Sequence, residues 1–132
     1  MRGDNILSLR QSVLDYVFGK YMVESDYPWQ NDDKSAVLRH RDNKKWFALI
    51  MRLSPGRLGF DGEEKIDVIN LKSDPILIGD LRQRQGFFPA YHMNKDRWIT
   101  VALDGSVGEE EIFSLIDLSY KLTKSKAKRA KK

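Results

Sequence analysis

The chain has 132 residues, a length typical of one domain with its own hydrophobic core. It contains no cysteine, which excludes disulfides, a thiol nucleophile and thiolate-bound metals. No apolar run approaches the roughly 20 residues of a membrane span, and the N-terminal MRGDNILSLRQ lacks the apolar block of a signal peptide. A cytoplasmic protein without a membrane partner is therefore expected.

The net charge of +4 is concentrated at the C-terminus. Residues 121–132 contain seven basic residues and no acidic one, whereas residues 1–120 hold 16 basic and 19 acidic residues, a net charge of −3. A basic tail attracts nucleic acid without sequence readout, or it serves only as a solubilising segment. We expect one domain over residues 1–123 and a basic, disordered tail over residues 124–132.

Apolar residues at three- and four-residue spacing predict a first helix, with Asp4 as its N-cap. Its buried stripe contains Ile6, Leu9, Val13, Val17 and Tyr21, widened by Leu14 and Phe18. The helix is expected to end before ESDYPW, because Pro28 and its polar neighbours break the pattern.

Three strands are predicted next. Residues 36–41 and 65–72 alternate between apolar and polar side chains, and residues 46–53 form a nearly continuous apolar run typical of a central strand. Residues 54–64 contain three glycines and a proline, which predicts a loop. Strands joined by short loops without helices form an antiparallel sheet.

A second helix is predicted over residues 75–85. Asp74 suits its N-cap, Pro75 its first position and Gly86 the position after its end. An extended segment through Pro89 and a strand over residues 97–103 follow, with Ile99 on one face and Trp98 on the other.

The last helix is predicted from the capping-box spacing of Ser106 and Glu109. Ile112, Leu115, Ser119 and Leu122 mark its buried stripe. The order of elements predicts an α+β two-layer sandwich, an antiparallel sheet with helices packed on one face.

Groups that could perform catalysis are sparse. His40 and His92 are the only histidines, and no nucleophile elbow, phosphate-cradling glycine loop or H-E-x-x-H pair occurs. We expect a protein that is not an enzyme and needs no cofactor.

Four stretches resemble the MmcQ/YjbR family of small bacterial proteins: KWFAL, INLKSDP, PAYHMNKDRWITVALDGSV and LIDLSYKL, supported by YPW at residues 27–29. The resemblance spans about residues 6–123 and implies a fold like that of CyaY, the bacterial frataxin. It also implies DNA binding through a "double wing" of β-hairpins. The loop over residues 54–64 is longer than usual for the family, and Gly108 stands where proline is common. A frataxin-like iron site would need an acidic first helix, but residues 5–23 contain only Asp15 as an acid, so no metal site is expected.

The first functional hypothesis is DNA binding through phosphate contacts, with little sequence specificity. Its basic residues are Lys44, Lys45, Arg82, Arg84, Lys95, Arg97, Lys126, Lys128 and Arg129. Tyr91 and His92 would stack on bases if they are exposed.

The alternative is a small-ligand or protein-binding module without a nucleic-acid role. The PAYHMNK segment would then line a cleft where the last strands meet the second helix, through Tyr91, His92, Asn94 and Trp98. Whether Trp98 belongs to the core or forms a stacking platform stays open from the sequence.

Overall fold

One antiparallel sheet organises the molecule, in the strand order β1-β2-β3-β5-β4. The computed structural model describes residues 8–59 and 61–124. The strands are β1 (Ala36–Arg39), β2 (Trp46–Leu53), β3 (Ile66–Lys72), β4 (Phe87–Pro89) and β5 (Trp98–Ala102). The helices are α1 (Leu9–Tyr21), α2 (Pro75–Leu81) and α3 (Glu109–Thr123), with a short 3-10 helix, η2 (Pro55–Leu58).

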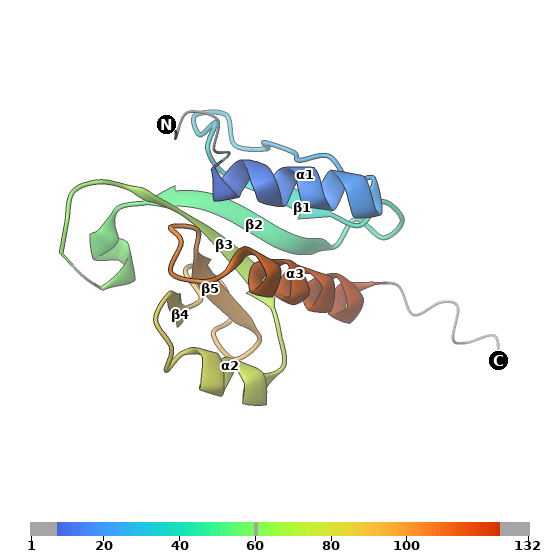
Figure 1. Cartoon of the computed structure of the whole chain (residues 1–132). Coiled ribbons are helices and arrows are strands. Elements are labelled where there is room, and N and C mark those ends of the chain that lie inside the picture. Colours follow the sequence, from blue (N-terminus) through green and yellow to red (C-terminus); the bar gives the residue numbers. More distant parts are fainter. Residues whose placement is uncertain (1–7, 60, 125–132) are drawn as a thin grey trace.

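The main core lies between the sheet and the helices, and α1 and α3 lie side by side over one face of the sheet (Figure 1). Val13 and Val17 of α1 and Ile112 and Ile116 of α3 are buried there. Alternate residues of the strands meet them, among them Leu38, Ile50, Ile69, Leu71, Ile99 and Val101. This arrangement confirms the predicted α+β sandwich with helices on one face.

The opposite face of the sheet, called here the open face, carries a second apolar cluster. It consists of Val37, Leu49, Met51 and Val68, one or two from each of three neighbouring strands. The short 3-10 helix η2, through Leu58, and the irregular segment before β5, through Tyr91 and Met93, pack against it. Both faces of β2 are therefore covered, as its continuous apolar run predicts.

A β-bulge in β2 decides which side chains reach the open face. Leu38 of β1 pairs with Ala48, but the next residue, Arg39, pairs with Trp46, so Phe47 is the extra residue. Phe47 and Ala48 therefore both join the helix-side core, and Trp46 packs with the cluster on the open face. Regular alternation would have placed Trp46 on the face of Ala48.

The ends of α1 differ in part from the sequence-based expectation. Ser8 caps the helix by accepting a hydrogen bond from the backbone N–H of Gln11, while Asp4 lies outside the described residues. Phe18, expected to widen the buried stripe, is 46% exposed. Met22 ends the helix in the left-handed conformation with φ 58°.

The second helix is shorter than predicted. Asp74 caps it by accepting from the N–H of Leu77, and Pro75 opens it as expected, but it ends at Leu81 instead of continuing to residue 85. Gly86 belongs to the turn that follows, with φ 93°. A Cβ there would meet the side chains of Ser106 and Val107 at 2.6 Å, so only glycine fits without a shift.

The predicted capping box of α3 is wrong. Gly108 occupies the N-cap position without a side-chain cap, and the Ser106 hydroxyl donates instead to the Asp104 carboxylate at 2.6 Å. Glu109, Glu110 and Glu111 still fill the first turn, where negative charge is favoured. In the described part of the chain, no helix is both long and apolar enough to cross a membrane.

Asp117 connects α3 to α1. Its carboxylate accepts hydrogen bonds from the hydroxyls of Tyr16 at 2.7 Å and Tyr21 at 2.6 Å, and it pairs with Lys20 at 3.0 Å. Burial acts to raise the pKa of Asp117, but these three donors together hold it below its usual value. Burial and the bond to Asp117 raise the pKa of both tyrosines.

Candidate functional site

The strand register brings basic residues from separate parts of the sequence to one end of the sheet. Arg39 at the end of β1 faces Trp46 at the start of β2, and Lys72 at the end of β3 faces Trp98 at the start of β5. The turn before β2 and the turn before β5 therefore leave the sheet at the same end.

The C-terminus of α3 lies at this end too. Nε2 of His40 lies 2.8 Å from the Thr123 hydroxyl, and the Asn43 amide donates to the Thr123 carbonyl at 3.2 Å. These contacts fix the β1–β2 turn, which carries Lys44 and Lys45, against the end of α3. Burial lowers the pKa of His40, which favours its neutral form.

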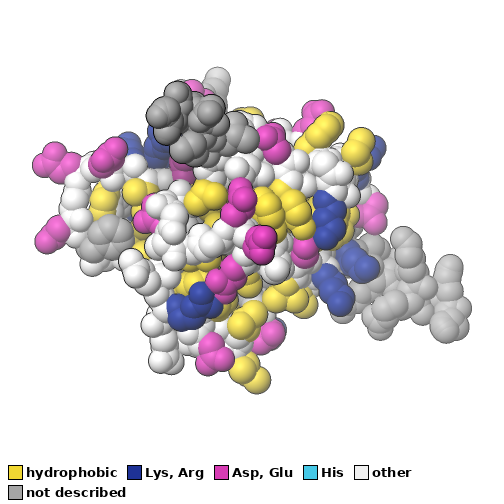
Figure 2. Space-filling view, in the orientation of Figure 1, with side chains coloured by type: hydrophobic (Ala, Val, Ile, Leu, Met, Phe, Trp, Pro, Cys, Tyr) yellow, Lys and Arg dark blue, Asp and Glu magenta, His cyan; other side chains and the backbone are white. Residues whose placement is uncertain are grey.

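We call this surface the basic end. It comprises Arg41, Lys44, Lys45, Lys72, Lys95, Arg97, Lys121 and Lys124, with Asp42, Asp74 and Asp96 among them. The Ser73 N–H donates to the Arg97 carbonyl at 2.9 Å, which ties the turn before β5 to the end of β3. Figure 2 shows Lys and Arg side chains gathered near the C-terminal end of α3, and Asp and Glu side chains spread over the rest of that face beside a second group of Lys and Arg.

Arg82 and Arg84 do not join the basic end. The Arg84 guanidinium forms two hydrogen bonds with the Glu111 carboxylate in the first turn of α3, at 2.6 and 2.8 Å. The bond to Arg84 lowers the pKa of Glu111. Arg84, one of the predicted phosphate contacts, is therefore already paired with an acidic residue at the start of α3. Lys126, Lys128 and Arg129 lie outside the described residues.

The PAYH segment is fixed to the open face by a buried polar network. Asn70 of β3 and Thr100 of β5 are fully buried and hydrogen-bonded to each other. The Asn70 amide donates to the Tyr91 carbonyl at 3.0 Å, and the Thr100 hydroxyl accepts from the Tyr91 N–H at 3.0 Å. Two central strands thus hold both backbone groups of one residue, which determines where Tyr91 and His92 lie.

His92 has a left-handed backbone, with φ 61°, which is uncommon for a residue other than glycine. Its ring packs against the Tyr91 ring with centroids 4.0 Å apart. The Tyr91 hydroxyl accepts a hydrogen bond from Arg57 of η2 at 2.7 Å. Among the described residues, none forms a hydrogen bond with the ring nitrogens of His92.

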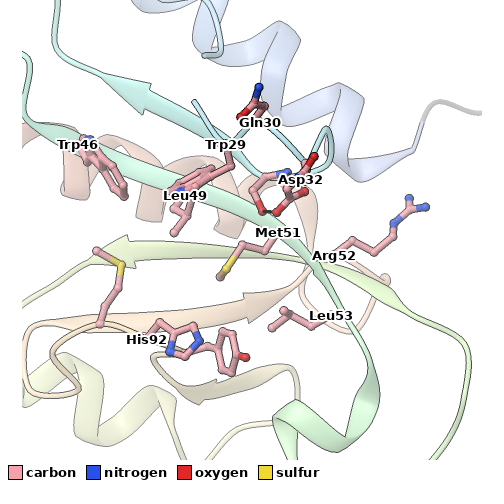
Figure 3. A pocket seen from close by; sticks show the side chains of 13 residues that line it. Trp29, Gln30, Asp32, Trp46, Leu49, Met51, Arg52, Leu53 and His92 are labelled. Carbon is pink, nitrogen blue, oxygen red and sulfur yellow. Dashed lines mark hydrogen bonds between the residues drawn. The ribbon is translucent and has the colours of Figure 1, made fainter. Parts of the chain in front are cut away.

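These side chains form one wall of a groove of about 700 Å³ on the open face (Figure 3). Tyr91, His92 and Met93 line one side, and the segment from Trp29 to Ser35 lines the other. Trp46, Leu49, Met51, Arg52 and Leu53 of β2 form the floor and ends. The rings of Trp29 and Trp46 meet edge to face, with centroids 5.9 Å apart.

The groove therefore lies at a different place from the cleft predicted between the last strands and α2. Tyr91 and His92 line the groove, but Asn94 and Trp98 do not. Asn94 instead closes the turn before β5, since its side chain accepts from the Asp96 N–H at 2.8 Å. Trp98 lies on the face opposite Ile99, as predicted, and is half-buried rather than core or fully exposed.

The charged groups at the groove are already paired. The Asp32 carboxylate accepts hydrogen bonds from the N–H groups of Lys34 and Ser35 and from the Ser35 hydroxyl. Arg52 forms two hydrogen bonds with Asp67, and Figure 3 shows its guanidinium turned away from Leu49 and Met51. The Ser35 and Lys34 bonds lower the pKa of Asp32. The lining of the groove is thus mainly apolar, and among the described residues it holds no unpaired Asp, Glu, Lys or Arg.

Sequence reasoning missed Trp29, Trp46, Leu49 and Met51 as site residues. For Trp46, Leu49 and Met51 the only local signal is the apolar surplus on β2, which is equally typical of a strand buried on both faces. The YPW stretch contains Trp29 but does not indicate that it lies opposite His92.

The fold and the site define a class of protein, a small α+β sandwich with one helix-covered face and one grooved face. The sequence matches the model of the YjbR family over residues 18–122. Uncharacterized protein YyaQ of Bacillus subtilis is 43% identical over 115 residues, which cover 87% of this chain and 98% of YyaQ. Uncharacterized protein YjbR of Escherichia coli K12 is 41% identical over 58 residues, 43% of this chain and 49% of YjbR.

Solved structures of related proteins have the same fold. A crystal structure of a Pseudomonas syringae protein superimposes with a TM-score of 0.85 at 48% identity, over 87% of this chain and 98% of the other. The crystal structure of Deinococcus radiodurans protein DR2400, of domain family DUF419, gives a TM-score of 0.69 at 26% identity, over 92% and 86% of the two chains. The chain belongs to the YjbR family.

Proposed function

We propose that this protein is a non-enzymatic DNA-binding protein that contacts phosphates through its basic end, with little sequence specificity. One observation carries the proposal: cations from the β1–β2 turn, the end of β3, the turn before β5 and the end of α3 share one surface. In the sequence, Lys126, Lys128 and Arg129 follow shortly after Lys124. Phosphate contacts from lysine and arginine give affinity that does not depend on base sequence.

The net charge of −3 over residues 1–120 does not oppose this proposal, because most acidic residues lie away from the basic end, where eight cations stand against Asp42, Asp74 and Asp96. Glu109, Glu110 and Glu111 occupy the first turn of α3, at the opposite end of that helix. Asp67 pairs with Arg10 and Arg52 far from the basic end. A surface potential depends on where the charges lie, not on their sum alone.

The proposal departs from a double-wing arrangement at one hairpin. The connection between β2 and β3 leaves the sheet after Leu53 pairs with Ile66, at the end opposite Trp46. It carries Asp61, Glu63 and Glu64, so it is a poor surface for phosphates. We assign the phosphate contacts to the basic end only.

The test is a titration of duplex DNA against the full chain at several salt concentrations. Lys44→Gln with Lys45→Gln should weaken binding and reduce the slope of log K against log salt by about 1 for each phosphate that the variant no longer neutralises. Arg82→Gln with Arg84→Gln changes the net charge equally and should leave the slope unchanged. The same titration of a chain that ends at Lys124 measures how much residues 125–132 contribute to the affinity for DNA.

Two results would reject the proposal. One is the absence of binding at low salt by the full chain. The other is an equal loss of affinity in the two double variants, because binding would then follow net charge rather than the basic end.

A further inference from the structure

The groove on the open face is not explained by phosphate binding. Its interior is apolar, its charged neighbours are paired, and its volume of about 700 Å³ lies within the range of sites for small molecules. A groove that only results from incomplete coverage of a sheet would not need the two features described next.

The first feature is the fixed position of one wall. Asn70 and Thr100 are fully buried in the two strands beneath it and use their polar groups on the backbone of Tyr91. Buried polar groups are costly unless they are fully paired, and a paired network rigidifies the segment that it holds. The Tyr91 hydroxyl is fixed separately by Arg57.

The second feature is His92. It lies directly after this fixed residue in a left-handed conformation, and its ring lines the groove without a hydrogen bond to its nitrogens from the described chain. Non-glycine residues hold this conformation where the surrounding structure imposes it, at helix ends such as Met22, at turns and at ligand sites. His92 is thus a fixed polar group at an apolar, aromatic groove.

We propose that the groove binds a flat, uncharged aromatic molecule that hydrogen-bonds to His92. The indoles of Trp29 and Trp46 and the side chains of Leu49 and Met51 supply the apolar contacts. An uncharged ligand is inferred because Asp32 and Arg52 are satisfied within the protein and leave no free charge to neutralise one. This goes beyond the proposed DNA-binding function and does not depend on it.

The experiment uses the ¹⁵N-labelled full chain and indole as the probe, followed by NMR. Indole should shift the side-chain N–H signals of Trp29 and Trp46 and the amides of residues 49–53 and 91–93, with one common Kd. Trp29→Ala should weaken binding about tenfold, and Phe18→Ala, which removes an exposed aromatic ring from α1, should change it less than about twofold. Shifts that map elsewhere, or no shifts, overturn the proposal.

Two further arms test the chemistry. 1-Methylindole, which lacks the N–H donor, should bind the wild type more weakly than indole, and the difference should vanish in His92→Gly, where glycine keeps the left-handed backbone. If the difference persists in that variant, His92 is not the partner. Indole-3-acetate should bind no better than indole, and a gain above about tenfold overturns the uncharged class.

A final arm separates a small molecule from a second copy of the chain. Without indole, the same signals should not move as protein concentration rises. If they do move, the groove is a self-association surface, and the small-molecule proposal is lost.

Discussion

At the scale of single residues, Asn70 lies in the central strand β3 but holds the wall of the groove rather than packing in the helix-side core. Its neighbours Ile69 and Leu71 point into the helix-side core, while Asn70 itself faces the open side and is fully buried under the PAYH segment. Its amide and carbonyl groups are both used, toward Tyr91 and Thr100. A polar residue in the middle of a buried strand is stable only with such partners.

Asn70→Ala should therefore lower the free energy of unfolding by about 2–4 kcal/mol, because it leaves the Tyr91 carbonyl without its donor and opens a small cavity. Urea unfolding at pH 7 measures the change. Asn31→Ala provides the control. Asn31 is exposed, so the free energy of unfolding of this variant should stay within about 0.5 kcal/mol of the wild-type value. A similarly small effect in both variants would mean that the network does not hold the segment.

Met22 offers a second test at this scale. It ends α1 with φ 58°, its side chain is 57% exposed, and its backbone N–H donates to the Phe18 carbonyl. Glycine adopts this conformation without the Cβ penalty. Met22→Gly should raise the free energy of unfolding by about 0.5–1 kcal/mol in urea, whereas Met22→Ala, which keeps a Cβ, should not. Destabilisation by both substitutions would show that the Met22 side chain matters more than its backbone.

At the scale of elements, α1 and α3 are joined by a polar cluster as well as by the core. Asp117 accepts from Tyr16 and Tyr21 and pairs with Lys20, while Phe113 stacks on Tyr16 with ring centroids 4.0 Å apart. The carboxylate is the centre of this cluster, since each polar partner bonds to it. The packing of the two helices should therefore depend on its charge.

Asp117→Asn should lower the free energy of unfolding by about 1–2 kcal/mol at pH 7. The folded state depresses the pKa of Asp117, so the stability that its charge contributes is fully present above the unfolded pKa of about 3.9. That stability is lost as pH falls through the lower folded pKa. The gap between wild type and variant should thus be constant from pH 7 to 5 and shrink at lower pH.

Urea unfolding from pH 7 to pH 2.5 measures that gap. Asp15→Asn on the exposed side of α1 is the control and should show no such convergence. A gap that is independent of pH would exclude the carboxylate charge as its source.

At the basic extreme, the raised pKa of Tyr21 predicts a loss of stability as pH rises above about 10.

Periodicity in the sequence predicts the elements well but not their junctions. The apolar stripes of α1 and α3 and the alternation of β3 and β5 indicate most of the buried faces, because each depends on neighbours along the chain. Leu122, expected in the stripe of α3, is exposed like Phe18. The predicted end of α2 and the predicted cap of α3 were wrong. Gly86 belongs to a turn that lies close to Ser106 and Val107, which are distant in sequence, and Ser106 bonds to Asp104 instead of capping α3. Local rules do not include such contacts.

The candidate site was harder to predict than the fold for the same reason. Tyr91 and His92 were identified from their density of functional groups, but their partners Trp29 and Trp46 depend on the bulge at Phe47 and on the path of residues 29–35. Arg84 was expected to contact phosphates, because the sequence does not show that it pairs with Glu111, 27 residues further along the chain. Charge in a sequence does not indicate whether it is already neutralised in the fold.

At the scale of the whole molecule, the free energy of local opening should differ between the central strands and the β2–β3 connection. β3 pairs with β2 on one side and β5 on the other, and four consecutive residues, Val68 to Leu71, are buried. The β2–β3 connection instead consists of exposed residues over 61–65. Segments with few buried contacts open locally, while central strands open only with the whole domain.

Native-state hydrogen exchange should therefore separate these two regions. Amides of residues 68–71 should exchange only by global unfolding and follow the denaturant dependence of that transition. Amides of residues 61–65 should exchange faster and without that dependence. Strong protection of the connection would indicate contacts that the described residues do not account for.

The two ends of the molecule also differ in how they tolerate an attached label. α3 ends at the basic end, where Thr123 contacts His40 and Asn43, so a purification tag or a surface linker fused there would crowd the proposed DNA contacts. α1 begins near Asp67 and Lys34, through Arg10, at the opposite end of the sheet. Fusion partners, fluorophores and immobilisation chemistry therefore belong before Ser8, and an N-terminally tethered chain will present its basic end to solution.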